Sequence, residues 1–457
     1  MSSTTVEQRS IDYIPASERH GRPRSLFAVW FSANTSITAV VTGALMIVFG
    51  NSAPWAIVAI VVGNLVGGFF TALHSAQGPQ LGVPQMIQSR AQFGYVGAVL
   101  PLLLALMIYV GFYATGLVLG GQALAQLTHL PQTAAAVLFA VLSTVLAIYG
   151  YRHIHRYSRL ATILTGITFT ALFVRVLAQP QAGTVLSDGS FDLPAFVLGL
   201  SLAASWQLTF GPYVADYSRY LPADTSKGAV FGWTLAGGAV GGSLAMILGA
   251  LVAAIGGKEF MANEVGYLAH LGGPLAVVVL IAVVAGKLTG DTMSAYGGYM
   301  AIVTIATSFA PTTRLRQWVR IASIVAVSLV ALVIALAADS TFLSTFTNFL
   351  LFLLYFMIPW SAINLVDYYL VRHEDYDIAS LFTPAGIYGR LNVGAFVAYI
   401  AGVVIQVPFM NSSLYVGPLA ALMGGAEIAW VVGLVVAGLL YWISARRTQA
   451  STAPPTR

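Results

Sequence analysis

Two opposite charges stand in the middle of a long apolar run. Lys287 and Asp291 lie within AGKLTGDTMSAYGG at 285–298, inside a hydrophobic stretch from about 275 to 306. In a helix, residues four apart share one face, so these side chains would be neighbours. A charge at the centre of a bilayer costs about 2.5–3.5 kcal/mol on insertion scales. The pattern therefore indicates a functional pair, and we consider an ion pair, a cation ligand and a proton relay.

The composition places this stretch in a membrane. Of the 457 residues, 58% are hydrophobic and only 8% are charged, against about 25% charged in soluble domains. Apolar segments of about 20 residues recur along the chain, which predicts an all-α polytopic membrane protein. The absence of cysteine excludes disulfides, thiolate nucleophiles and cysteine metal sites. The polar first 25 residues lack a signal-peptide core and are expected to form a cytoplasmic tail.

Twelve transmembrane helices are expected, and their orientation follows from charge. They lie at about 26–49, 55–76, 96–118, 133–149, 157–178, 194–213, 229–255, 273–307, 318–337, 342–364, 392–411 and 418–443. With the N-terminus inside, all but three of the 21 basic residues fall on the inner side, the exceptions being Arg175, Lys258 and Lys287. Both termini are therefore predicted to be cytoplasmic. The net charge of +5 reflects this topology, so no nucleic-acid partner is expected.

Two spans carry signs of a break in the helix. The first reads WFSANTSITAVVTGALM and contains Ser32, Asn34 and Thr35, and the sixth contains Gly211-Pro212. Irregular backbone at membrane depth is tolerated only where it faces protein or a water-filled cavity. Broken helices at matching places in two halves indicate a transporter site, and spans one and six are five apart. The alternatives are a simple kink at Gly-Pro and hydroxyls that bond back to their own helix.

Four stretches resemble one family in order along the chain. They are IDYIPASERHGRPRSLFAVWFSANTSITAVVTGALMIVFG at 11–50, GPQLGVPQMIQSRAQFGYVGAVLP at 78–101, GPYVADYSRYLP at 211–222 and AINLVDYYLVRHEDYDIASLF at 362–382. The chain is similar to the purine–cytosine permeases of nucleobase–cation symporter family one, nearer the fungal type than the hydantoin transporters. The resemblance implies a leucine-transporter-like 5+5 inverted repeat plus two extra helices. The expected parts are a tail at 1–25, repeats at 26–178 and 194–364, two additional helices at 392–443 and a cytoplasmic tail at 444–457.

The family register also implies which residues meet the substrate. An aromatic ring stacks on the heterocycle where this chain has Phe112, which keeps the π-face of the usual tryptophan. Gln207 offers both a donor and an acceptor for a ring edge. Gly116 departs from the asparagine of fungal members, and Asp291 stands where relatives carry a neutral amide. The implied substrate-binding set is Ser32, Asn34, Tyr109, Phe112, Trp206, Gln207, Thr209, Asp291 and Ser294.

The coupling cation is expected between the first and eighth spans. The implied set is Thr35, Lys287, Thr289, Asp291 and Thr292. Three interpretations remain open: a stiffening ion pair, an Asp291 that binds substrate or sodium, and a Lys287–Asp291 pair that exchanges a proton. We favour the third, because burial moves the pKa values of lysine and carboxyl groups toward neutrality. The coupling ion is H⁺ or Na⁺, and no cofactor, metal centre or catalytic residue is expected.

The sequence thus predicts a symporter of the plasma (inner) membrane that imports a nucleobase, cytosine or a purine, by alternating access. The alternative cargo is pyridoxine, thiamine, allantoin or a hydantoin. A non-transporting receptor would need a signalling domain, an enzyme a cluster of histidines or carboxylates at one face, and a channel a repeated pore motif. The expected partners are the small heterocycle and the bilayer, and the oligomeric state is left open, a monomer included. Glu427, expected in the twelfth span, is assigned a structural or oligomer role.

Overall fold

The structure, a computed structural model, describes residues 12–149, 151–309, 317–338 and 341–452. The described part consists of helices, with no named strand. Nine helices in it are long and apolar enough to cross a membrane, or up to eleven if each of two bent pairs forms one span. Val393–Phe409 is a shorter apolar segment. The all-α membrane class is confirmed, while the count of twelve spans stays a prediction.

The first predicted break is present. Helices α1 (Ser25–Asn34) and α2 (Ile37–Val48) meet at an angle of 59°. Thr35 leaves helical geometry with ψ of 77°. The Ser36 side chain accepts a hydrogen bond from the Ala39 amide and so caps the start of α2. The short polar residues that signalled the break therefore also satisfy the backbone groups it frees.

The second break lies just before Gly211-Pro212. Helices α9 (Leu193–Leu208) and α10 (Gly211–Ser218) bend by 41°. Pro212 occupies the first turn of α10, where its missing N–H would have no helical partner in any case. The sequence-based expectation of an interrupted sixth span is confirmed.

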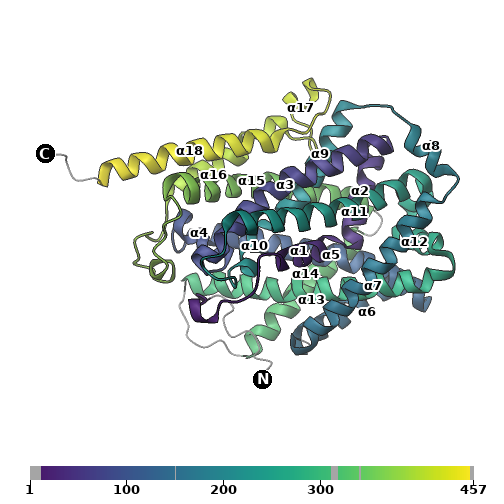
Figure 1. Ribbon diagram of the computed structural model, residues 1–457, viewed down its shortest axis with the longest axis horizontal. Helices are drawn as coiled ribbons and strands as arrows, with labels where there is room; N and C mark the ends of the chain where they lie inside the picture. Colours follow the sequence, from purple (N-terminus) through teal and green to yellow (C-terminus); the bar gives the residue numbers. More distant parts are fainter. Residues whose placement is uncertain (1–11, 150, 310–316, 339–340, 453–457) are drawn as a thin grey trace.

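The remaining long helices surround these two broken spans. Figure 1 shows α4 and the C-terminal end of α18 toward one end of the molecule, and α8 and α12 toward the other. Helix α13 packs against α5 and α7, and α11 packs against α1, α2 and α3. The bounds are α3 (Ala53–Leu81), α4 (Gln85–Phe93), α5 (Val99–Thr128), α6 (Gln132–Tyr149), α7 (Tyr151–Leu177), α8 (Gln181–Ser187), α11 (Lys227–Ala262), α12 (Glu264–Gly272), α13 (Ala276–Phe309), α14 (Gln317–Ala338), α15 (Phe342–Leu365), α16 (Val393–Val404), α17 (Pro418–Leu422) and α18 (Ala429–Thr452).

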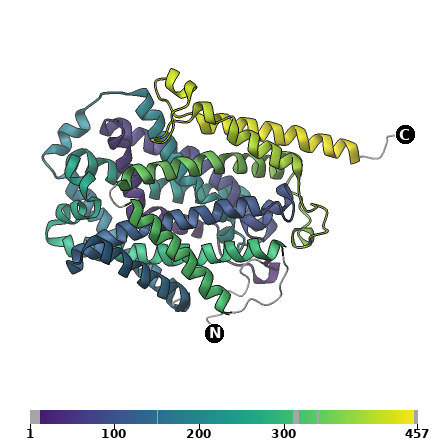
Figure 2. The ribbon, with the colours of Figure 1, turned by 180° about the vertical axis from the view of Figure 1, so that it is seen from behind.

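The last span differs from the expected 418–443. After the short α17, Gly424 and Gly425 adopt φ of +67° and +90°, a left-handed region that favours glycine, and α18 begins only at Ala429. Helix α18 then continues to Thr452, through most of the expected tail, and projects beyond the other helices in both views (Figures 1 and 2). Glu427 consequently precedes the helix instead of lying inside it.

Glu427 is a buried junction between three parts of the fold. Its Oε2 accepts hydrogen bonds from the Tyr355 hydroxyl of α15 (2.7 Å) and the Asn411 amide (2.5 Å), and its Oε1 accepts from the Ala429 amide (3.1 Å). Its main-chain oxygen accepts from Ser201 of α9 at 2.9 Å. The carboxylate therefore joins α15 to the start of α18, and the main-chain oxygen of the same residue joins α9 to them.

Candidate substrate and cation site

Aromatic rings from three helices meet beside the second break. Phe112 of α5 and Trp206 of α9 contact each other edge to face, with centroids 5.6 Å apart and planes at 88°. Phe349 of α15 contacts Phe112 in the same way, at 5.3 Å and 79°. The structure thus brings together two residues of the predicted substrate-binding set. Because their rings touch, a flat heterocycle could lie between them only after they separate and rotate toward a parallel arrangement.

Side-chain amides link the broken spans next to these rings. Gln207 Nε2 lies within hydrogen-bonding distance of Asn34 Oδ1 (3.1 Å), Asn64 Oδ1 (2.6 Å) and the Gly238 carbonyl (2.9 Å). Trp206 Nε1 also donates to Asn34 Oδ1, at 2.7 Å. These bonds join α1, α3, α9 and α11, so the polar groups predicted to read the substrate are engaged with one another.

The space beside this amide cluster is small. The gap lined by Trp30, Gly68, Thr71, Gln207, Thr234 and Gly238 is too narrow to hold a water-sized molecule. Ligand pockets usually have volumes of roughly 300–1,000 Å³. The cluster must therefore rearrange before it can enclose a ligand.

The two charges of α13 lie side by side, as the helical spacing predicts. Lys287 Nζ is 3.5 Å from Asp291 Oδ1 and donates a hydrogen bond to Thr38 Oγ1 of α2 at 3.2 Å. Asp291 is 0% exposed, and neither carboxylate oxygen has a hydrogen-bond partner among the described residues. The ion pair with Lys287 is the compensation for burying this carboxylate, and a buried pair is often no more stable than apolar residues of similar volume.

Gly116 makes room for that carboxylate. A Cβ atom at position 116 would lie 1.8 Å from Asp291 Oδ1 and 2.4 Å from Oδ2. Any larger residue at position 116 would therefore displace Asp291. Gly116 and Asp291 are thus in contact and form one structural unit.

The other predicted residues are spread around the breaks. Ser32 Oγ lies 2.9 Å from Thr162 Oγ1 of α7, and Tyr109 stacks on Tyr213 with centroids 5.7 Å apart. Ser294 is half-buried on α13. Four hydroxyls bond back to carbonyls of their own segments, namely Thr35, Thr209, Thr289 and Thr292. Ser and Thr hydroxyls commonly bond in this way in helices. Because each hydroxyl donates its hydrogen, its oxygen lone pairs remain available to a cation.

The sequence analysis missed one residue of the amide cluster and one of the aromatic cluster. Asn64 lies on α3 and is fully buried, and Phe349 lies on α15. An asparagine inside an apolar span is a signal that could have identified Asn64. Phe349 carried no such signal, because aromatic side chains are common in membrane helices.

Comparison with known proteins identifies the family of this chain. The model of the family described as "Permease for cytosine/purines, uracil, thiamine, allantoin" matches residues 13–433. The chain belongs to this permease family. A putative purine-cytosine permease, YxlA of Bacillus subtilis (strain 168), is 40% identical over 438 residues, which cover 96% of this chain and 95% of the relative. Purine-cytosine permease fcyB of Emericella nidulans is 25% identical, over 95% of this chain and 87% of the relative.

Solved structures confirm the fold of this permease. The inward-facing conformation of Mhp1 superimposes with a TM-score of 0.78 at 18% identity, over 98% of this chain and 96% of Mhp1. Mhp1, a nucleobase-cation-symport-1 family transporter, in a closed conformation with bromovinylhydantoin bound, gives a TM-score of 0.76. The resemblance found in the sequence is thereby confirmed. As a member of a permease family, the chain is a membrane transporter and not an enzyme.

Proposed function

We propose that this permease imports a nucleobase, cytosine or a purine, by cation symport with alternating access. The observation that carries the proposal is the cluster of Phe112, Trp206 and Gln207 at the break in the sixth span. Aromatic faces and a few convergent polar groups are what a flat, polar-edged heterocycle requires. The relatives named as purine-cytosine permeases support the same cargo.

We infer that the coupling ion is a proton, handled by Lys287 and Asp291. The Lys287 ammonium bonds to Thr38 just beyond the break in the first span. It thus occupies, with its own positive charge, the region between the first and eighth spans where a sodium ion would bind. The carboxylate of Asp291 has two oxygens without hydrogen bonds among the described residues, which leaves room for a proton to be gained and released.

Both termini are placed on the cytoplasmic side of the plasma membrane in this proposal. The support is the distribution of basic residues, most of which gather on one side when the N-terminus is inside. Of the three exceptions, Arg175 stands near the opposite end of its helix and Lys287 within the membrane.

Uptake into proteoliposomes tests the cargo and the ion together. Labelled cytosine, adenine and hypoxanthine should accumulate when the outside is made acidic with no sodium present. Asp291→Asn should abolish this accumulation and still exchange labelled for unlabelled substrate, because exchange needs no net proton movement. The exposed Asp188→Asn is the matched control and should behave as the wild type.

Two results would overturn parts of the proposal. Strict dependence on sodium would contradict proton coupling while leaving nucleobase transport intact. Competition by pyridoxine, thiamine, allantoin or hydantoin, with none by cytosine or purines, would contradict the cargo.

A further inference from the structure

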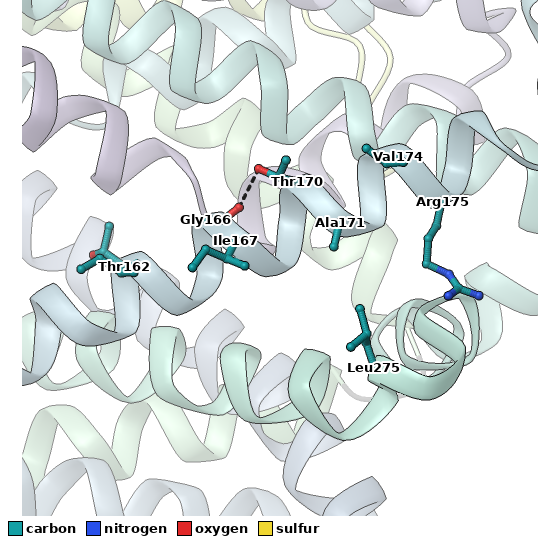
Figure 3. A pocket seen from close by; sticks show the side chains of 9 residues that line it. Thr162, Gly166, Ile167, Thr170, Ala171, Val174, Arg175 and Leu275 are labelled. Carbon is teal, nitrogen blue, oxygen red and sulfur yellow. Dashed lines mark hydrogen bonds between the residues drawn. The ribbon is translucent and has the colours of Figure 1, made fainter.

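An apolar groove runs along the outer surface of α7. It has a volume of about 750 Å³ and is lined by Thr162, Ile163, Gly166, Ile167, Thr170, Ala171, Val174, Arg175 and Leu275. Figure 3 shows Thr162 and Arg175 at opposite ends of it and Leu275 across from the helix. Several of its apolar side chains are open to the surroundings, with Ile167 67% and Val174 63% exposed. Since α7 is a membrane span, these surroundings are lipid.

The floor of the groove is empty at Gly166. A Cβ atom at this position would meet no atom within 4 Å. In a bilayer, the side chains that line an unfilled apolar depression lack dispersion contacts. A hydrocarbon chain that fills the depression supplies them. Thr162 and Arg175 are about 20 Å apart along the helix at 1.5 Å per residue. That length is comparable to one leaflet, which is about half of a roughly 30 Å hydrocarbon core.

A guanidinium closes one end of the groove. Arg175 Nε donates to the Leu271 carbonyl at the end of α12, at 2.8 Å, and the group packs over Gly273. Its terminal nitrogens make no hydrogen bond to any described residue, although Arg175 is half-buried. An arginine held in this way at the end of an apolar span presents two terminal nitrogens, each with N–H donors, which is the arrangement that binds phosphate.

We propose that this groove binds a glycerophospholipid, with one acyl chain against Gly166 and Ile167 and the phosphate on the Arg175 guanidinium. An anionic headgroup suits the site best, since the lining offers one positive charge and no carboxylate. The inference does not depend on the identity of the cargo.

The groove also reaches the transport site. Thr162, at its far end, shares a hydrogen bond with Ser32 on α1. Helix α7 is joined to α13 by two long hydrogen bonds, from Tyr157 to the Ala285 carbonyl (3.3 Å) and from Thr165 to the Ala282 carbonyl (3.4 Å). A bound acyl chain would therefore rest against a helix that packs on the helix carrying Lys287 and Asp291.

Native mass spectrometry of the purified full chain with added phosphatidylglycerol tests the proposal. Arg175→Gln should weaken retention of this lipid roughly tenfold, the loss expected for a charge-assisted hydrogen-bonded contact. Arg159→Gln, on the same helix but outside the groove, is the matched control and should retain the lipid. Phosphatidylcholine should bind more weakly than phosphatidylglycerol, and inorganic phosphate alone should not displace either lipid.

A second test fills the groove and leaves the charge of Arg175 in place. Gly166→Leu would place a side chain in open space and should reduce lipid retention several-fold while the fold is kept, because leucine favours helix over glycine. Gly232→Leu, on α11, also meets open space and serves as its control. Equal retention by Gly166→Leu, Arg175→Gln and both controls would overturn the proposal.

Discussion

At the scale of single residues, Gly116 and Asp291 depend on each other. A Cβ atom at position 116 would lie 1.8 Å from Asp291 Oδ1, so the absence of a side chain at Gly116 is what leaves room for the carboxylate. An asparagine at 116 could not coexist with Asp291 in its present place. The two positions therefore form a matched pair, so a substitution at one must be judged together with the residue at the other.

Gly116→Ala is expected to destabilise the protein and to abolish uptake. The added methyl group would meet the Asp291 carboxylate, and overpacking of this kind typically costs about 1–3 kcal/mol. The double variant Gly116→Ala/Asp291→Ala should recover most of that stability without recovering uptake. Thermal unfolding in detergent measures the first effect and proteoliposome uptake the second.

Gly166→Ala is the control for this cycle, since a methyl group there meets no atom within 4 Å. If Gly116→Ala proved as stable as Gly166→Ala, the contact between Gly116 and Asp291 would not have the proposed importance. A coupling energy near zero between positions 116 and 291 would lead to the same conclusion.

At the scale of elements, α15 is held by the segment that precedes α18. Tyr355 donates to Glu427, and Gln406 donates to the Tyr355 carbonyl at 2.8 Å. Ser205 of α9 donates to the Leu350 carbonyl of α15 at 2.5 Å. These bonds fix α15, and with it Phe349, relative to Trp206 in the aromatic cluster. The segment between α16 and α18 therefore helps to shape the candidate site.

Tyr355→Phe should lower the free energy of unfolding by about 1.5–3 kcal/mol, because it removes a hydrogen bond to a buried charged group. The exposed Tyr415→Phe provides a matched control and should change it by less than about 0.5 kcal/mol. Chemical or thermal unfolding in one detergent compares the two variants. Equal stabilities would show that the Tyr355–Glu427 contact does not hold α15.

The elements differ in how well the sequence predicts them. Both broken spans are visible because Gly-Pro and clusters of short polar residues have no place in a regular membrane helix. The turn before α18 was missed because Gly424 and Gly425 lie in an apolar run, and hydropathy does not register a positive φ. The edge-to-face contact of Phe112 with Trp206 could not be predicted from the sequence either, since ring orientation depends on neighbours from distant helices.

At the scale of the whole molecule, the lack of cysteine permits a clean test of orientation. Ser187→Cys lies at the end of α8, and Ala385→Cys lies in the loop between α15 and α16, both at exposed positions. In intact cells a membrane-impermeant thiol reagent should label the first and not the second. Permeabilised cells should label both. The reverse pattern would invert the proposed topology, and the unsubstituted chain gives the background.

The hydrogen bonds that the Gln207 side chain donates to Asn34 and Asn64 have a consequence for any affinity measurement. A conformation that frees these side chains for a ligand must break these bonds, so the arrangement seen here competes with ligand binding. An observed dissociation constant equals the intrinsic value divided by the competent fraction. A substitution that weakens these hydrogen bonds can thus tighten apparent binding while removing a contact to the ligand. Affinity alone will therefore rank variants by how easily they open as much as by how well they hold their cargo.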